Sequence, residues 1–177
     1  NEKRKKSIKR YVKKYPGELL HADTYQVAKT LTTDRKRYYL LGAIDDCTRL
    51  CHVELIEKQT AADVTKAYFR CHKWMQAHGI EPEAVMTDNG VEFTAYTSQK
   101  ARETHFFETM LSIINVKHVY TRPYQPQVNG KIERFWRNIL QLLTYGSRHQ
   151  ENLRLEKQFG KMEVPTSLNS NSYLIFC

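Results

Sequence analysis

The sequence has no apolar run that approaches the roughly 18 residues needed for a membrane-spanning helix. It also lacks the apolar N-terminal stretch of a signal peptide. We therefore expect a soluble, intracellular protein. Cysteine is scarce too, with four residues at positions 47, 51, 71 and 177. Four scattered cysteines do not make a dense disulfide framework, so we expect free thiols in a reducing cytosol.

Positive charge is concentrated at the N-terminus. The first fourteen residues, NEKRKKSIKRYVKK, hold eight Lys/Arg and one Glu, which is +7 of the formal net charge of +9. A basic arm before a nearly neutral domain indicates contact with a polyanion, nucleic acid first. Lys5 and Lys6 are the arm residues that we expect to touch phosphates. A solvated tail without a ligand is the alternative, and the arm alone does not decide between the two.

The chain of 177 residues is long enough for one domain with a full core and extensions. We divide it into a basic arm and linker at 1–16, a folded core at 17–146 and an extension at 147–177. The extension shows no clear hydrophobic period, so we expect it to be irregular.

Secondary structure follows from the hydrophobic pattern. Five strands are predicted, at 18–27, 37–45, 49–56, 84–87 and 116–120. Three helices are predicted, from Thr60 to a stop at Gly79, from 98 to 114, and from about 130 to 145 after a Pro-containing loop. The order predicts an α/β fold with a mixed five-stranded sheet, three strands antiparallel and two parallel, flanked by helices.

Three acidic residues stand where a hard cation could be bound. Asp23 lies within the first strand, and Asp88 follows the fourth strand at an Asn-Gly turn. Glu133 is predicted in the first turn of the last helix, at the edge of an apolar stripe. Each has a structural alternative: a strand-edge charge for Asp23, a turn former for Asp88, and a surface residue that complements the helix dipole for Glu133.

Two longer segments help to decide whether these acids bind a cation or have only structural roles. TDNGVEF at 87–93 and TRPYQPQVNGKIERFWRNI at 121–139 closely resemble the signatures of the DDE integrase core, in the branch of bacterial insertion-sequence transposases. ELLHADTYQV resembles the strand that carries the first aspartate of that family, and LLGAIDDCTRL resembles the strand and turn after it. The resemblance runs from about 17 to 145 and implies an RNase H-like fold for an integrase-type catalytic core.

The resemblance also implies a reaction. Asp23, Asp88 and Glu133 match the catalytic, metal-binding carboxylates of a polynucleotidyl transferase that uses Mg²⁺, with Mn²⁺ as a substitute. Such enzymes cut phosphodiesters at the ends of a mobile element and join the freed 3′-hydroxyl to target DNA, without a covalent enzyme–DNA intermediate. The partners implied are element-end and target DNA and further copies of the chain, as a homodimer or higher oligomer. No membrane and no small-molecule cofactor is expected, and the location implied is cytoplasmic, at the nucleoid.

Further positions match residues of that family that face DNA. Tyr124, Gln127 and Asn129 match the loop beside the site, and Lys131 and Arg137 match positions on the following helix. Arg122 is expected to join them. Lys and Arg side chains there would bind phosphates without reading sequence.

The sequence departs from the family pattern in three places. The stretch between Asp88 and Glu133 is long, and we place the extra residues near 95–104. No DNA-end-recognition module precedes the core, and the usual His-Arg-Pro segment is missing after it. We therefore expect a truncated or decaying copy with an intact site, an out-of-frame tail at 160–177, or an excised fragment. A nuclease that only hydrolyses and a non-catalytic DNA-binding remnant are the competing functions.

Other polar residues are given less weight. Cys47, Cys51 and Cys71, with the adjacent histidines, do not have the spacing of a zinc site. Asp45 and Asp46 precede Cys47-Thr48, which favours a hairpin turn, although Asp45 could also support the site from behind.

Overall fold

The computed structural model describes residues 12–32, 34–121, 126–148 and 172–176, and for 126–129, 142–148 and 172–176 it describes the backbone alone. The arm residues Lys5 and Lys6 lie outside the described residues. Among the helices of the described chain, none combines the length and the apolar character that crossing a bilayer requires.

The sheet contains the five predicted strands in the predicted directions. They are β1 (Leu20–Val27), β2 (Tyr38–Asp45), β3 (Leu50–Ile56), β4 (Ala84–Thr87) and β5 (Lys117–Tyr120), and they lie side by side in the order β5-β4-β1-β2-β3. β1, β2 and β3 are antiparallel neighbours, and β4 and β5 extend β1 in parallel. The mixed five-stranded sheet predicted from the sequence is therefore confirmed.

A sixth strand was not predicted. β6 (Ser172–Phe176) pairs antiparallel with β3 at the edge of the sheet, inside the 147–177 extension that we expected to be irregular. The SYLIF sequence of β6 is too short and isolated for its period to be recognised, and the open edge of β3 supplies its backbone partners. The division into arm, core and extension stays a prediction.

The helices differ from the prediction in two places. α1 (Ala61–Ala77) begins as expected, with the Thr60 side chain accepting from the Asp63 N–H, but the helix predicted at 98–114 is split into α2 (Gln99–Glu103) and α3 (Phe106–Ile113). The split occurs because His105 has an extended backbone and caps α3 through its side chain. α4 (Pro126–Arg148) begins earlier than the predicted residue 130, so residues expected in a loop are helical. A 3₁₀ turn, η1 (Lys29–Leu31), follows β1.

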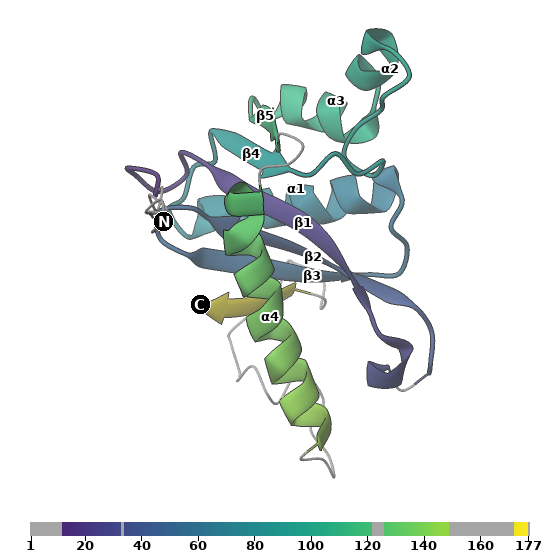
Figure 1. Ribbon diagram of the computed structural model, residues 1–177. Coiled ribbons are helices and arrows are strands. Elements are labelled where there is room, and N and C mark those ends of the chain that lie inside the picture. The colour runs from purple at the N-terminus through teal and green to yellow at the C-terminus, as the bar shows by residue number, and fades with distance from the viewer. Residues whose placement is uncertain (1–11, 33, 122–125, 149–171, 177) are drawn as a thin grey trace, which may run out of the picture.

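The helices cover both faces of the sheet (Figure 1). Alternate side chains of β1, β2 and β3 enter two separate cores because successive strand residues point to opposite faces. One core, with Leu20, Leu41 and Ile56, packs against α1 and α3. The other, with Ile44 and Val53, packs against the apolar stripe of α4. Asp23 lies on the α4 side, since it alternates with Ala22 of the first core.

Candidate active site

The parallel pairing of β1 with β4 brings the first two predicted carboxylates together. Leu20 is paired with Val85 and His21 with Met86, so the same offset of 65 residues sets Asp23 beside Asp88. Asp88 comes directly after the last residue of β4. Two acids 65 residues apart along the chain thus become neighbours across adjacent strands, at the edge where ligands of open sheets bind.

Asp23 is held by donors from two elements. Its Oδ1 accepts from the Thr24 N–H at 2.8 Å, and its Oδ2 accepts from the indole Nε1–H of Trp136 at 2.9 Å. Trp136 is buried in the α4 core, and Gly42 of β2 makes the room for it. The sequence analysis assigned no role to Trp136. Its buried N–H, which needs an acceptor, is the signal that could have assigned it to the site.

Asp88 starts a tight turn whose backbone it stabilises. Its Oδ1 accepts from the Gly90 N–H at 2.9 Å, and the Asn89 amide donates to the carbonyl of Thr121 at 3.3 Å. Thr121 in turn donates its N–H to the Thr87 carbonyl at 3.1 Å. The turn is thereby fastened to the end of β5, and Asp88 itself stays exposed to solvent.

A third acid, Glu92, lies near this site in the same turn. The Glu92 carboxylate is buried, and its Oε1 accepts from the Thr24 hydroxyl at 2.8 Å and from the Gln59 amide at 2.5 Å. The sequence analysis quoted TDNGVEF but assigned no role to Glu92. The signal was available, because an acid four residues after Asp88 in a turn that folds back must lie near it.

The pKa values of Asp23 and Asp88 are both raised. Burial raises the pKa of Asp23 to about 6, the charges of Asp88 and Glu92 add to the rise, and the Trp136 and Thr24 donors oppose it. The pKa of Asp88 is also raised, first because its carboxylate is partly desolvated although the residue as a whole is exposed, and then by the charge of Glu92. Carboxylates in this state are stabilised by a nearby cation.

Glu133 is not gathered with these acids. It is an exposed residue of α4, and because the helix begins at Pro126 it lies in the third turn, not in the predicted first turn. The proposed support of its charge by the helix N-terminus is therefore wrong, since that effect fades beyond the first turn. Among the described residues, no three His, Cys, Asp or Glu side chains converge closely enough to hold a metal ion. Glu133 does lie one helical turn before Trp136, which contacts Asp23.

Of the predicted DNA-facing residues, Arg122 and Tyr124 lie outside the described residues. Gln127 and Asn129 lie in the first turns of α4, where the backbone alone is described, and not in a loop. Arg137 is exposed on α4.

Lys131 is engaged inside the protein. Its Nζ contacts Asp46 Oδ1, the same oxygen that His21 Nε2 meets at 2.7 Å, while Asp46 Oδ2 accepts from the Lys13 N–H at 2.7 Å. Although burial would raise the pKa of Asp46, these partners hold it well below its usual range.

Asp45 has a local role. Its side chain accepts from the N–H and hydroxyl of Thr48, both at 2.7 Å, and from the Gly17 N–H at 2.9 Å. The hairpin turn predicted for this stretch is confirmed, and Asp45 lies away from the carboxylates of the site.

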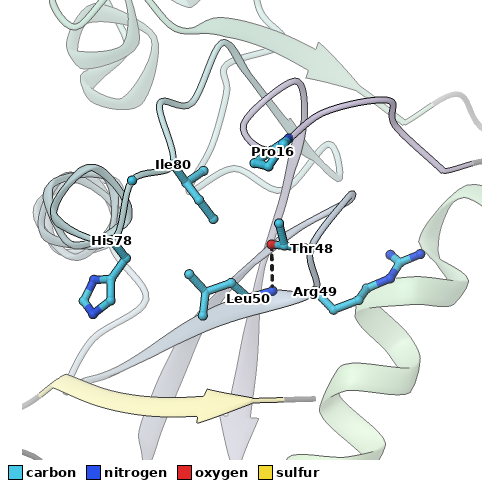
Figure 2. A pocket seen from close by; sticks show the side chains of 7 residues that line it. Pro16, Thr48, Arg49, Leu50, His78 and Ile80 are labelled. Carbon is cyan, nitrogen blue, oxygen red and sulfur yellow. Dashed lines mark hydrogen bonds between the residues drawn. The ribbon is translucent and has the colours of Figure 1, made fainter.

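A hollow of about 300 Å³ lies on another part of the molecule (Figure 2). Pro16, the Thr48–Leu50 turn and the 78–80 segment after α1 line it, without any acidic side chain. Nothing in its lining suits the predicted chemistry.

The donor set around Asp23 suits a hard divalent cation. Its members are carboxylate oxygens, which Mg²⁺ prefers, and Asp23 and Asp88 could both reach one ion because their strands are adjacent. The pKa values of Asp23 and Asp88 are raised by desolvation, and among the described contacts only neutral N–H donors stabilise their negative charges. A resident cation would remove that penalty.

Comparison with known proteins agrees with this geometry. The family profile described as "Integrase core domain" matches residues 13–126. A putative integrase, ORF3, of Spiroplasma virus SpV1-C74 is 34% identical over 148 residues, covering 80% of this chain and 40% of the relative. The Pol-related polyprotein of the mouse intracisternal A-particle MIA14 is 30% identical over 123 residues, covering 70% of this chain and 13% of the polyprotein. The chain thus spans less than half of the length of these relatives.

Solved structures share the fold at lower identity. The HTLV-2 integrase catalytic core domain in complex with magnesium, in a trimeric form, has a TM-score of 0.59 at 20% identity and covers 81% of this chain and 80% of that one. The simian T-cell lymphotropic virus intasome in complex with PP2A regulatory subunit B56 gamma gives a TM-score of 0.61 at 19% identity, with coverage of 91% and 55%. Together with the sheet order and the closeness of Asp23 to Asp88, the profile match over residues 13–126 places this chain in the integrase core domain family.

Proposed function

We propose that this protein transfers DNA strands: it cleaves phosphodiesters at the ends of a mobile element and joins the 3′-hydroxyl to target DNA. The observation that carries the proposal is that Asp23 of β1 lies close enough to Asp88, at the end of the adjacent parallel strand β4, for the Asp88 charge to raise the pKa of Asp23, in a chain of the integrase core family. Integration or transposition in general follows from the family, and cleavage followed by strand transfer is the specific form that we propose.

Asp23 and Asp88 would hold Mg²⁺, or Mn²⁺ in its place, with Glu133 as the third ligand. Divalent ions in such a site supply charge neutralisation at the phosphate and an activated oxygen nucleophile. Trp136 fixes the orientation of the Asp23 carboxylate. Glu133 precedes Trp136 by one turn, which supports a position on the same flank of α4. Glu133 would complete the set by a change of side-chain rotamer or a small shift of α4 on binding DNA.

DNA would approach along the exposed flank of α4. Arg137 is exposed there, and the predicted DNA contacts Arg122, Tyr124, Gln127 and Asn129 precede it along the chain. The relatives support a multimer on DNA, since one solved neighbour is a trimeric form and another is an intasome. We therefore propose that two or more copies hold the element ends, at the nucleoid of the host cell.

The test is a strand-transfer assay with a pre-nicked element end and labelled target DNA, in Mg²⁺ and in Mn²⁺. Asp23→Asn and Asp88→Asn should each lower joining by about 1,000-fold, because each removes a ligand worth several kcal/mol of transition-state stabilisation. Glu133→Gln should have the same effect while DNA binding persists. Glu103→Gln on α2 is the matched control and should be active.

The alternatives give different outcomes in that assay. Hydrolysis without any joined product would identify a nuclease that only cuts. Full activity of Glu133→Gln would end the assignment of the third carboxylate. DNA binding without cleavage by the unmodified protein would identify a non-catalytic remnant.

A further inference from the structure

Glu92 is buried without an opposite charge. Its residue is 7% exposed, and in the part of the chain that the structure describes its carboxylate meets only neutral donors, the Thr24 hydroxyl and the Gln59 amide. A buried charge is normally paired or bound to a metal, because desolvating it is costly. Hydrogen bonds to neutral groups alone therefore do not account for a charged side chain at this position.

The fold fixes Glu92 beside the two aspartates. The neighbouring Phe93 is fully buried, and its N–H donates to the Gly90 carbonyl at 3.0 Å, so the turn closes on itself. A point one Cβ bond from Gly90 lies 2.5 Å from Glu92 Oε2 and 3.0 Å from Asp88 Oδ1. The other carboxylate oxygen is tied to Thr24, the residue next to Asp23. Glu92 thus bridges the strand of one aspartate and the turn of the other.

The hydrogen bonds alone do not require a charge. A glutamine side chain has the same length, and its carbonyl oxygen could accept from both Thr24 and Gln59. What glutamate adds is a negative charge next to Asp23 and Asp88. In the absence of a cation that charge is unfavourable, because like charges held close together repel one another.

We infer that Glu92 is a positioning residue that supplies a further buried negative charge beside Asp23 and Asp88 and so strengthens the binding of a divalent cation. This inference rests on the proposed function of the Asp23–Asp88 site. Glu92 acts through the field at that site and through its bonds to Thr24 and Gln59. It is not required to touch the ion, in keeping with the lack of a three-acid binding group among the described residues.

Two substitutions distinguish the effect of the Glu92 charge from the effect of its side-chain length. Glu92→Gln keeps the length and the acceptor but removes the charge, whereas Glu92→Asp keeps the charge but shortens the reach to Thr24. If the charge of Glu92 is what strengthens cation binding, Mn²⁺ affinity should be highest in wild type, lower in Glu92→Asp and lowest in Glu92→Gln. Removing a unit charge close to a divalent ion in a partly buried site should weaken binding by about tenfold.

The experiment is calorimetric titration of the metal-free full chain with MnCl₂. Glu81→Gln, which removes an exposed charge ahead of β4, is the matched control and should bind Mn²⁺ as the wild type does. Thermal unfolding in EDTA should show Glu92→Gln at least as stable as wild type, because it relieves repulsion. A lower affinity with an unchanged or higher melting temperature distinguishes the role from a purely structural one.

Three results would overturn the inference. Wild-type affinity in Glu92→Gln would show that its charge is irrelevant. Weaker binding by Glu92→Asp than by Glu92→Gln would assign the effect to the tether and not to the charge. Failure of the wild type itself to bind Mn²⁺ would remove the metal site of the proposed function, and the role of Glu92 with it, whereas the first two results leave that site intact.

Discussion

Two aspartates beside α4, Asp46 and Asp23, have opposite surroundings. Asp46 meets His21, the Lys131 ammonium and the Lys13 N–H, and its pKa is lowered. Asp23, two residues after His21 on the same strand, has Asp88 and Glu92 as its charged neighbours, and its pKa is raised. α4 contacts both, through Lys131 at one and Trp136 at the other.

This difference distinguishes Asp46, which has a structural role, from Asp23, which is suited to binding a cation. Asp46 is satisfied within the folded chain, and it joins the N-terminal linker, β1 and α4 at one point. Asp23 is also held in place by hydrogen bonds, but its described contacts include no cation. Burial of an acid is therefore a poor guide to function until the sign of its neighbours is known.

The largest effect should come from Asp46. Asp46→Ala leaves His21 and Lys131 without their shared acceptor, so the free energy of unfolding should fall by about 3 kcal/mol. Asp23→Asn, in contrast, should leave it unchanged or raise it, because the amide still accepts from Trp136 while repulsion is removed. Urea denaturation in EDTA measures both. A larger loss for Asp23→Asn than for Asp46→Ala would invert the assignment of the two acids.

Gly42 should be the next most sensitive position. An added Cβ would stand 2.5 Å from Phe135 and 2.7 Å from Trp136, so Gly42→Ala must push α4 away from the sheet at a cost of about 2 kcal/mol. Thermal unfolding and tryptophan fluorescence would record the change. Gly130→Ala on α4, where a Cβ meets nothing within 4 Å, is the control and should stabilise the helix by up to about 1 kcal/mol. Equal melting temperatures for the two variants would contradict this packing.

The two aspartates should respond to pH with opposite signs. For Asp23, the pKa is 3.8 without the fold and about 6 within it, so the folded protein binds more protons between these values and loses stability as the pH rises through them. For Asp46, the lowered pKa means that its stabilisation is present above about pH 4 and is lost as the pH falls further.

Unfolding measured in EDTA from pH 3 to 7 tests this contrast. The stability of wild type relative to Asp23→Asn should decrease between about pH 4 and pH 6 and then level off. A relative stability that increases over that interval would mean that Asp23 is stabilised as a carboxylate, like Asp46.

The smallest effects should separate Lys131 from Arg137. Lys131→Met should lower the free energy of unfolding by about 1 kcal/mol, since a partly exposed pair contributes little. Arg137→Met should leave stability unchanged, weaken DNA binding and reduce the salt slope of binding by about 1. Fluorescence anisotropy over a range of salt concentrations measures the slope. If Lys131→Met alone reduced the slope, Lys131 would have to leave Asp46 to contact DNA.

The sequence alone gave correct strands, the α1 cap at Thr60 and the positions of Asp23 and Asp88, because each follows from a local pattern. Hydrophobic alternation marks the strands, and an Asn-Gly turn marks the end of β4. It misplaced the start of α4, since Pro126 can begin a helix as readily as it can end a loop. It also missed β6, whose five residues depend on the edge of β3 for their hydrogen bonds.

The amino-acid sequence thus determined the five predicted strands and the family, since these depend on residue order and local periodicity, while the assignment of the acids as metal ligands stays a proposal. The tertiary structure decided which charges meet. It set Lys131 against Asp46, Trp136 against Asp23, and Glu92 beside Asp23, while it left Glu133 exposed. Such contacts join residues dozens of positions apart, and their sign depends on strand register and on the rotation of α4, which no local pattern encodes.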